Sequence, residues 1–208
     1  MQQVPRAGQA GFTLIESMVA LAIFAILLAM GVPRMSDWLT ATKAANAAGF
    51  YAEGFTLARL QALSNNSQSR LVFRANAGGQ PDWQVDICLR TTDTPCSVES
   101  DWSSVDKAAK DATGASAAFR SIRRSAAALP PSTRLSVTLG PNGGNAVYFT
   151  PLGWVDTSRA PRVTRIDLKP PAGQSGAFKA SAVTLTLAGV AATCNPDAAE
   201  GASTWCPQ

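Results

Sequence analysis

One apolar run near the N-terminus limits what this chain can fold into more than any other feature. Residues 12–32 read FTLIESMVALAIFAILLAMGV, and Glu16 is the only charged residue among them. A helix rises about 1.5 Å per residue, so this run spans roughly 32 Å, close to the roughly 30 Å hydrocarbon core of a bilayer. Arg6 lies in the polar segment before it, and positive charge there favours a cytoplasmic N-terminus. The run predicts one membrane span, with the rest of the chain outside the cytoplasm.

Glu16 distinguishes this run from an ordinary hydrophobic anchor. A cleaved signal peptide has a shorter apolar region, of about 7–15 residues. A plain signal anchor remains an alternative, but a carboxylate within the membrane costs roughly 2.5–3.5 kcal/mol on insertion scales. Cleavage between Gly11 and Phe12 would create an α-amino group close to Glu16. Pairing of the two charges, within one subunit or between two, would offset much of that cost.

The composition narrows the possible chemistry. The 208 residues suit one globular domain with an extra element, and 46% of them are hydrophobic. Histidine does not occur in the sequence, which removes histidine-based triads and most zinc sites. No serine or cysteine has an identifiable base nearby, so we expect no enzyme activity, no cofactor and no metal site.

The segment Gly11-Phe12-Thr13-Leu14-Ile15-Glu16 resembles the class III signal of type IV pilins and type II secretion pseudopilins. The resemblance implies that prepilin peptidase cuts after Gly11 and methylates Phe12, and that Glu16 faces the N-terminal amine of a neighbouring subunit. It also implies a helix kink at Pro33. The implied partners are other pilin subunits, prepilin peptidase and the inner-membrane assembly platform.

After the membrane span, the pattern predicts an α+β fold. A second helical stretch covers Leu39–Leu63, where Phe50, Gly54, Leu57 and Ala58 share one apolar face. Short β-rich runs separated by turn-forming clusters follow: Arg70–Ala75, Trp83–Leu89, Ala117–Ile122, Arg134–Leu139, Ala146–Thr150, Arg162–Leu168 and Ala182–Leu187. We expect a long N-terminal helix, transmembrane and then amphipathic, packed on an antiparallel sheet or sandwich. The expected parts are a leader (1–11), a transmembrane helix (12–32), a periplasmic helix half (33–66) and a head (67–208).

A weaker resemblance concerns the head. Leu57-Ala58-Arg59 with Asn65-Asn66 resembles the helix-to-strand junction of GspH/FimT-type minor pilins, and Phe149, Pro151 and Gly153 resemble their F-x-P-x-G segment. Some FimT-like proteins carry a G-R-x-R motif linked to DNA binding, but here the stretch reads Gly189-Val190-Ala191-Ala192. The tail is closer to FimU-like subunits that initiate pili.

Four cysteines form two local groups, Cys88 with Cys96 and Cys194 with Cys206. Neither group has metal-site spacing, and in an exported chain an even number of cysteines predicts disulfides. Local pairing is favoured, although three connectivities remain open.

Two arginine groups are candidate nucleic-acid contacts: Arg120, Arg123 and Arg124, and Arg162 with Arg165. The alternative is that they are solvated strand edges and loops, where positive charge opposes aggregation. DNA binding is doubtful without the G-R-x-R arginines.

The sequence thus predicts a minor pilin of a type IV pilus, with roles in pilus assembly or initiation and so in twitching motility or adhesion. The alternatives are a GspH-like pseudopilin of type II secretion and a DNA-binding minor pilin of natural transformation. A membrane-anchored enzyme would need an acid–base pair that the sequence does not offer.

Overall fold

A computed structural model of the chain describes residues 13–89, 96–97, 101–111, 113–141, 143–174 and 176–206. One long helix, α1 (Leu14–Ser64), is followed by strands and the short 3₁₀ helix η2 (Ala126–Ala128). The strands are β1 (Gln68–Ala75), β2 (Pro81–Cys88), β3 (Ile122–Arg124), β4 (Ser136–Gly140), β5 (Ala146–Phe149), β6 (Arg165–Lys169), β7 (Ser181–Leu185) and β8 (Ala191–Cys194). The predicted α+β class is confirmed. Two compact units meet between Leu39 and Thr40: the first part of α1, and the rest of α1 with the strands.

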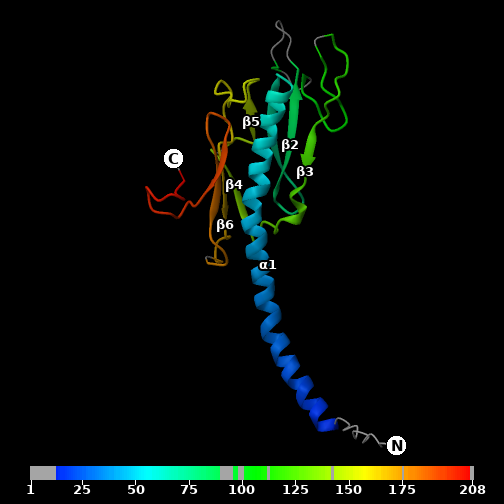
Figure 1. Cartoon of the computed structure of the whole chain (residues 1–208), viewed down its shortest axis with the longest axis vertical. Helices are drawn as coiled ribbons and strands as arrows, with labels where there is room; N and C mark the ends of the chain where they lie inside the picture. Colours follow the sequence, from blue (N-terminus) through cyan, green and yellow to red (C-terminus); the bar gives the residue numbers. More distant parts are fainter. Residues whose placement is uncertain are drawn as a thin grey trace, which may run out of the picture. The chain divides into compact units, whose positions relative to one another are not determined.

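The strands of the second unit form two antiparallel sheets. Their strand orders are β3-β2-β1-β5 and β4-β6-β7-β8. The β1–β2 hairpin has the longest register, from Gln68 opposite Cys88 to Ala75 opposite Pro81. In Figure 1 the second part of α1 runs along both sheets, which makes this part of the helix their common packing surface.

The core is built from small residues on the helix and large ones on the strands. The buried face of α1 consists of Ala44, Ala47, Ala48, Tyr51, Phe55, Ala58 and Ala62. Both sheets contribute to the same cluster, the first through residues such as Trp83 and the second through residues such as Ile166. Alanine lets the helix backbone approach the sheets closely, and the two aromatic rings fill the space between them.

The buried helix face differs slightly from the predicted one. Gly54 and Ala58 are buried as expected, but Phe50 and Leu57 lie at its margin and are half-buried. The face is centred on Tyr51 and Phe55 because the contact with two sheets, and not helix periodicity alone, selects it. Gly54 is constrained by packing, since a Cβ there would lie 3.2 Å from side-chain atoms of Leu71 and Trp83.

Two other sequence expectations were wrong. Residues 117–122 were expected to form a strand, but the strand is β3 at 122–124, and Ala109 instead pairs with Ala117 and Phe119 through isolated backbone hydrogen bonds. Residues 191–194 lie beyond the last predicted strand, at 182–187, yet they form β8 beside β7. The expectation of one long helix is confirmed, because α1 continues through Pro33 and its later part is the second helical stretch that the sequence indicated. The kink at Pro33 stays a prediction.

Asp82 connects three segments of the first sheet. Its buried carboxylate accepts hydrogen bonds from Asn76 Nδ2 at 2.9 Å, the Ala126 backbone N–H at 2.8 Å and Arg123 Nη2 at 2.8 Å. Burial alone would raise the pKa of Asp82, but these hydrogen bonds and the charge of Arg123 together lower it below its usual value. The ionised carboxylate therefore stabilises the fold.

The ionisation of the Asp82 carboxylate should make the free energy of unfolding depend on pH. A depressed pKa in the folded state gives stability that is present above the unfolded pKa of about 3.9 and is lost as pH falls through the folded pKa. We expect Asp82→Asn to lower the free energy of unfolding by about 2 kcal/mol at pH 7, and by less as pH falls below about 4. Chemical denaturation of the full chain in detergent at pH 7 and pH 3 measures this. An equal loss at both pH values would contradict the assignment.

Candidate functional site

The first turn of α1 is arranged around Thr13. The Glu16 backbone N–H donates to Thr13 Oγ1 at 3.3 Å, and the Ser17 backbone N–H donates to the Thr13 carbonyl at 3.2 Å. Thr13 is therefore the N-cap, and Thr13-Leu14-Ile15-Glu16 has the spacing of a capping box. The Glu16 carboxylate lies in the first turn, where the helix dipole favours negative charge. The helix thus begins at Leu14, two residues after Phe12, which is the predicted new N-terminal residue.

The first part of α1 exposes apolar side chains on all sides. Examples are Leu14 at 79%, Leu21 at 68% and Met30 at 65% exposure. The helix is long and apolar enough to cross a membrane. Ile15, Glu16, Val19, Ala20 and Ile23 line one shallow groove along it, which places the carboxylate within an otherwise apolar stripe. Nothing in the described chain covers this stripe, so its burial must come from lipid or from another chain.

Gly11 and Phe12 lie outside the described residues, so cleavage after Gly11 and methylation of Phe12 stay predictions. The assembly role of Glu16 likewise stays a prediction, although the structure places its carboxylate in the turn nearest to Phe12.

Comparison with known families gives a match at this end of the chain. Residues 6–32 match the family model described as the prokaryotic N-terminal methylation motif. This match supports a type IV pilin-like protein. No curated protein and no solved structure shows significant similarity to the chain. For a pilin-like chain, the motif implies processing by prepilin peptidase and assembly with other pilins, and the apolar helix fits a single-pass membrane anchor.

Three segments of the head that are distant in sequence meet at one point. Arg59 Nε donates to the Gly153 carbonyl at 3.2 Å. Gly189 approaches so closely that a Cβ there would lie 2.2 Å from the same carbonyl oxygen and 3.0 Å from Arg59 Cδ. Gly189 also has a positive φ of 76°. The helix and both sheets are thereby joined at Gly153.

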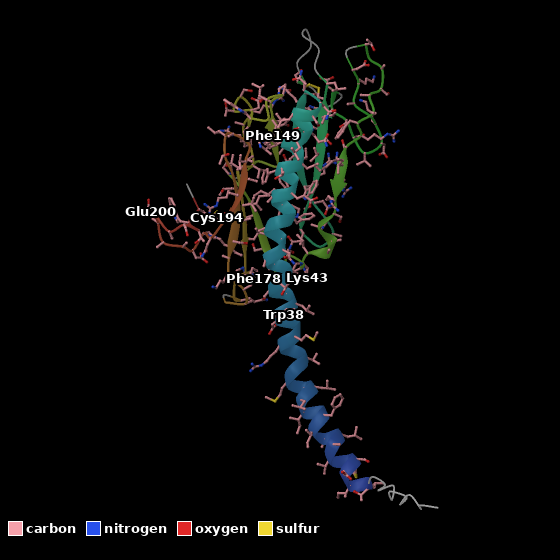
Figure 2. The ribbon with its side chains drawn as sticks, viewed as in Figure 1. Trp38, Lys43, Phe149, Phe178, Cys194 and Glu200 are labelled. Atoms are coloured by element: carbon pink, nitrogen blue, oxygen red, sulfur yellow. A yellow bond between two sulfur atoms is a disulfide. The ribbon has the colours of Figure 1, made fainter. Side chains whose placement is uncertain are left out.

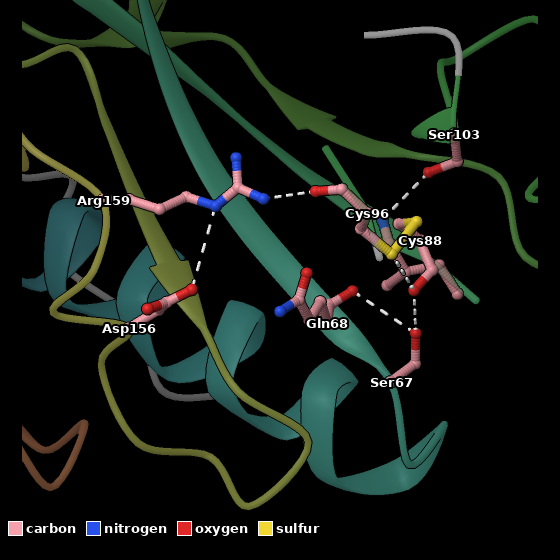
Figure 3. The surroundings of a disulfide bond; sticks show 8 residues. Ser67, Gln68, Cys88, Cys96, Ser103, Asp156 and Arg159 are labelled. Carbon is pink, nitrogen blue, oxygen red and sulfur yellow. Dashed lines mark hydrogen bonds and ion pairs between the residues drawn. A yellow bond between two sulfur atoms is a disulfide. The ribbon is translucent and has the colours of Figure 1, made fainter. Parts of the chain in front are cut away.

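The structure joins the cysteines within each local group. The S–S distance is 2.00 Å between Cys88 and Cys96 and 2.10 Å between Cys194 and Cys206. Figure 3 shows that the first disulfide is attached to its surroundings on two sides. Ser67 donates to the Cys88 carbonyl, and Arg159 donates to the Cys96 carbonyl while lying 3.8 Å from Asp156. The second disulfide links β8 to the C-terminal tail.

The candidate nucleic-acid arginines do not come together. Arg123 and Arg124 belong to β3 at the edge of the first sheet, whereas Arg165 belongs to β6 in the second. Three of the five are held by carboxylates: Arg123 by Asp82 at 2.8 Å, Arg124 by Glu53 at 2.8 Å and Arg165 by Asp167 at 2.9 Å. Arg120 is exposed and Arg162 is half-buried. Because these ion pairs neutralise much of the charge, the arrangement does not favour a phosphate-binding surface, and the nucleic-acid role stays a prediction.

The sequence patterns did not single out Arg70, which is the most buried of the ion-paired cations described. Its guanidinium lies 2.8 Å from Asp86 and 4.6 Å from the ring centroid of Trp102. Trp102 in turn packs edge-on against Tyr148. Alternation along β1 offered only a weak signal, because a charged residue in a strand usually faces solvent. Among the described residues there is no cluster of metal-ligating side chains.

The close approach at Gly189 leads to a matched prediction. Gly189→Ala and Gly201→Ala both place alanine at a positive φ, 76° and 85° respectively, which costs about 1–2 kcal/mol. A Cβ at Gly201 meets nothing within 4 Å, whereas one at Gly189 meets the Gly153 carbonyl. We therefore expect Gly189→Ala to lower the free energy of unfolding by a further 1–3 kcal/mol or so. Thermal denaturation of both variants measures this, and equal melting temperatures would contradict the close contact.

Proposed function

We propose that this chain is a minor pilin of a type IV pilus, of the GspH/FimT type and FimU-like, which takes part in pilus assembly or initiation and so in twitching motility or adhesion. One observation carries the proposal: an uncovered apolar stripe on α1, with Glu16 in its first turn, lies within a prokaryotic N-terminal methylation motif. A stripe of this kind suits a helix that leaves lipid and becomes buried among the helices of other subunits.

Assembly then exchanges one apolar environment for another. Before assembly, the helix lies in the inner membrane and the head lies in the periplasm, where disulfides persist. Within the filament, the same side chains pack against neighbouring helices, so their burial is retained. The Glu16 carboxylate forms an ion pair with the positively charged, methylated Phe12 amine of a neighbouring subunit. This ion pair fixes the register between the two subunits. This role is structural and needs no catalysis. The assembly platform supplies the work of extraction.

The boundaries of the parts follow from this scheme. Residues 1–11 would be the removed leader, 12–32 the membrane and filament-core helix, 33–66 the periplasmic half of the helix, and 67–208 the head with its disulfide-bonded tail. The hydrogen bond from Arg59 to the Gly153 carbonyl supports the GspH/FimT type, because it joins two of the segments that resemble those proteins. A pseudopilin of type II secretion has the same physics and is the second candidate.

A deletion in the parent organism tests whether the chain belongs to a type IV pilus or to a type II secretion system. We expect a clean deletion to abolish surface pili and twitching and to leave protein secretion unchanged, with both restored by the full chain supplied from a plasmid. Electron microscopy and the profile of secreted proteins, scored side by side, measure this. Normal pili with cargo trapped in the periplasm would replace the pilus assignment with the type II secretion one.

The carboxylate gives a second test. Glu16→Gln keeps a capping-box residue at the same helix position and removes only the charge. Loss of one partner of a buried charge pair costs about 3–5 kcal/mol, so we expect at least a tenfold drop of the chain in sheared filaments. Membrane insertion should be retained, because a neutral side chain inserts more easily. Immunoblots of the filament and membrane fractions measure both, with Ser17→Ala as the control. Unchanged incorporation would remove Glu16 from the assembly scheme.

A further inference from the structure

One edge of the head is tied to the residues with which α1 enters it. Arg134 Nη1 donates to Thr40 Oγ1 at 3.4 Å, although the two residues are 94 positions apart in sequence. Gln174 Nε2 donates to the Thr133 carbonyl at 3.5 Å, which brings the β6–β7 loop (170–180) to the same place. Phe178 of this loop packs on the core cluster that α1 lines. We call this part of the surface, made of residues 40–43, Arg134 and the β6–β7 loop, the basal edge.

The strands and the helix agree on where the basal edge lies. β6 ends at Lys169 and β7 begins at Ser181, so the loop that joins them is at this end of the second sheet. Figure 2 shows Phe178 and Lys43 near one end of the head and Phe149 toward the other. The basal edge is therefore the end at which the chain enters the head, not the end at which α1 stops.

The basal edge is close to the apolar run along the chain. Thr40 follows Val32 by eight residues, which is about 12 Å of continuous helix. Trp38 lies between them and is 64% exposed. Tryptophan beside a membrane span is typical of the lipid headgroup layer. Since Thr40 is only about 3 Å further along the helix than Trp38, the chain itself brings the basal edge to that layer.

The basal edge is also basic. Its exposed cations come from α1, from the segment before β4 and from both ends of the β6–β7 loop: Lys43, Arg134, Lys169 and Lys179. Within the described part of the chain, no ion pair neutralises the three lysines, in contrast to the arginines of β3 and β6. Asp37 on α1 and Asp197 beside the loop oppose this charge, but the cations outnumber them. The edge thus keeps a positive charge that no part of the described chain uses.

A hollow gives the basal edge depth. It encloses about 500 Å³, and its lining includes Lys169, Pro170, Phe178, Lys179, Asn195 and Asp197. The lining has two lysines against one aspartate, so its net charge is positive, and the Asn195 amide adds hydrogen-bond donors. Pro170 and Phe178 supply apolar surface beside these polar groups. Positive charge next to apolar surface suits a ligand that has an anionic head and an apolar continuation.

We propose that the basal edge docks on anionic phospholipid headgroups of the membrane that α1 spans, with Lys169 and Lys179 as the main phosphate contacts. Lysine binds phosphate as a point charge. The potential of an anionic membrane surface extends over about a Debye length, roughly 8 Å at physiological salt, and attracts basic segments next to a membrane span. The contact orients the head on the membrane while the chain waits for assembly.

The inference goes beyond the proposed function and needs only the membrane anchor. It holds for a type IV pilus and for a type II secretion system alike, because in both the head rests beside the membrane before assembly. An acidic protein could recognise the same cations. The membrane is favoured because the short stretch of helix from Val32 to Thr40 already brings the basal edge to the lipid.

Photo-crosslinking in lipid nanodiscs tests the contact. The full chain is inserted into nanodiscs of phosphatidylcholine, with or without added phosphatidylglycerol. A photoreactive amino acid replaces Ala177, an exposed residue of the β6–β7 loop. We expect at least fivefold more lipid adduct, detected by mass spectrometry, when phosphatidylglycerol is present. The same amino acid at Ala115 is the control and should give little adduct in either lipid, because Figure 1 shows the segment between β2 and β3 toward the other end of the head.

A charge reversal provides the second arm. Lys179→Glu should lower the phosphatidylglycerol adduct at position 177 at least threefold. Lys110→Glu makes the same charge change at an exposed lysine between β2 and β3 and should leave the adduct unchanged. Higher salt should lower the adduct in the same way as Lys179→Glu, because it screens exposed charges. Resistance to protease in the nanodiscs checks that each variant is folded.

The outcomes separate this inference from the proposed function. Equal adducts in the two lipid compositions, or equal effects of the two charge reversals in folded chains, would overturn the contact. In membranes of the parent organism, an adduct of position 177 with a protein in place of lipid would assign the basal edge to an acidic partner and overturn it as well. Each of these results leaves the pilus assignment intact. Trapped secretion cargo in the deletion strain would replace the pilus assignment and leave the lipid contact intact.

Discussion

The apolar side chains of the first part of α1 have nothing in their own chain to pack against, and the rest of the molecule depends on this. Leu14, Leu21 and Met30 are more than half exposed, while alanines one helix segment later are fully buried. A single helix therefore has two surroundings: the first part of α1 must be covered by lipid or by another chain, and the later part is covered by the two sheets. Alanines on the later part of α1 allow this, because they let the helix backbone approach the sheets closely while Tyr51 and Phe55 fill the remaining space.

In the proposed filament, the predicted role of Glu16 is to fix the register of the helix against its neighbours. An apolar stripe packs in many registers with little difference in energy, but a buried carboxylate needs one particular partner. Thr13 holds that carboxylate in the first turn, so its position relative to the N-terminus is fixed by the helix cap. The N-cap Thr13 and the charged Glu16 thus lie in one short segment, in which the cap fixes where the helix begins and the carboxylate supplies its charge.

Sequence patterns predicted the local features well and the long-range ones poorly. The span, the helix after it and the α+β class follow from hydrophobic length and period, which are local properties. β8 was missed because its small residues have low strand propensity and pair only since β7 lies beside them. Arg70 was missed because its partners Asp86 and Trp102 are distant in sequence. Gly153 and Gly189 could be noted separately in the sequence, but their close approach exists only in the fold.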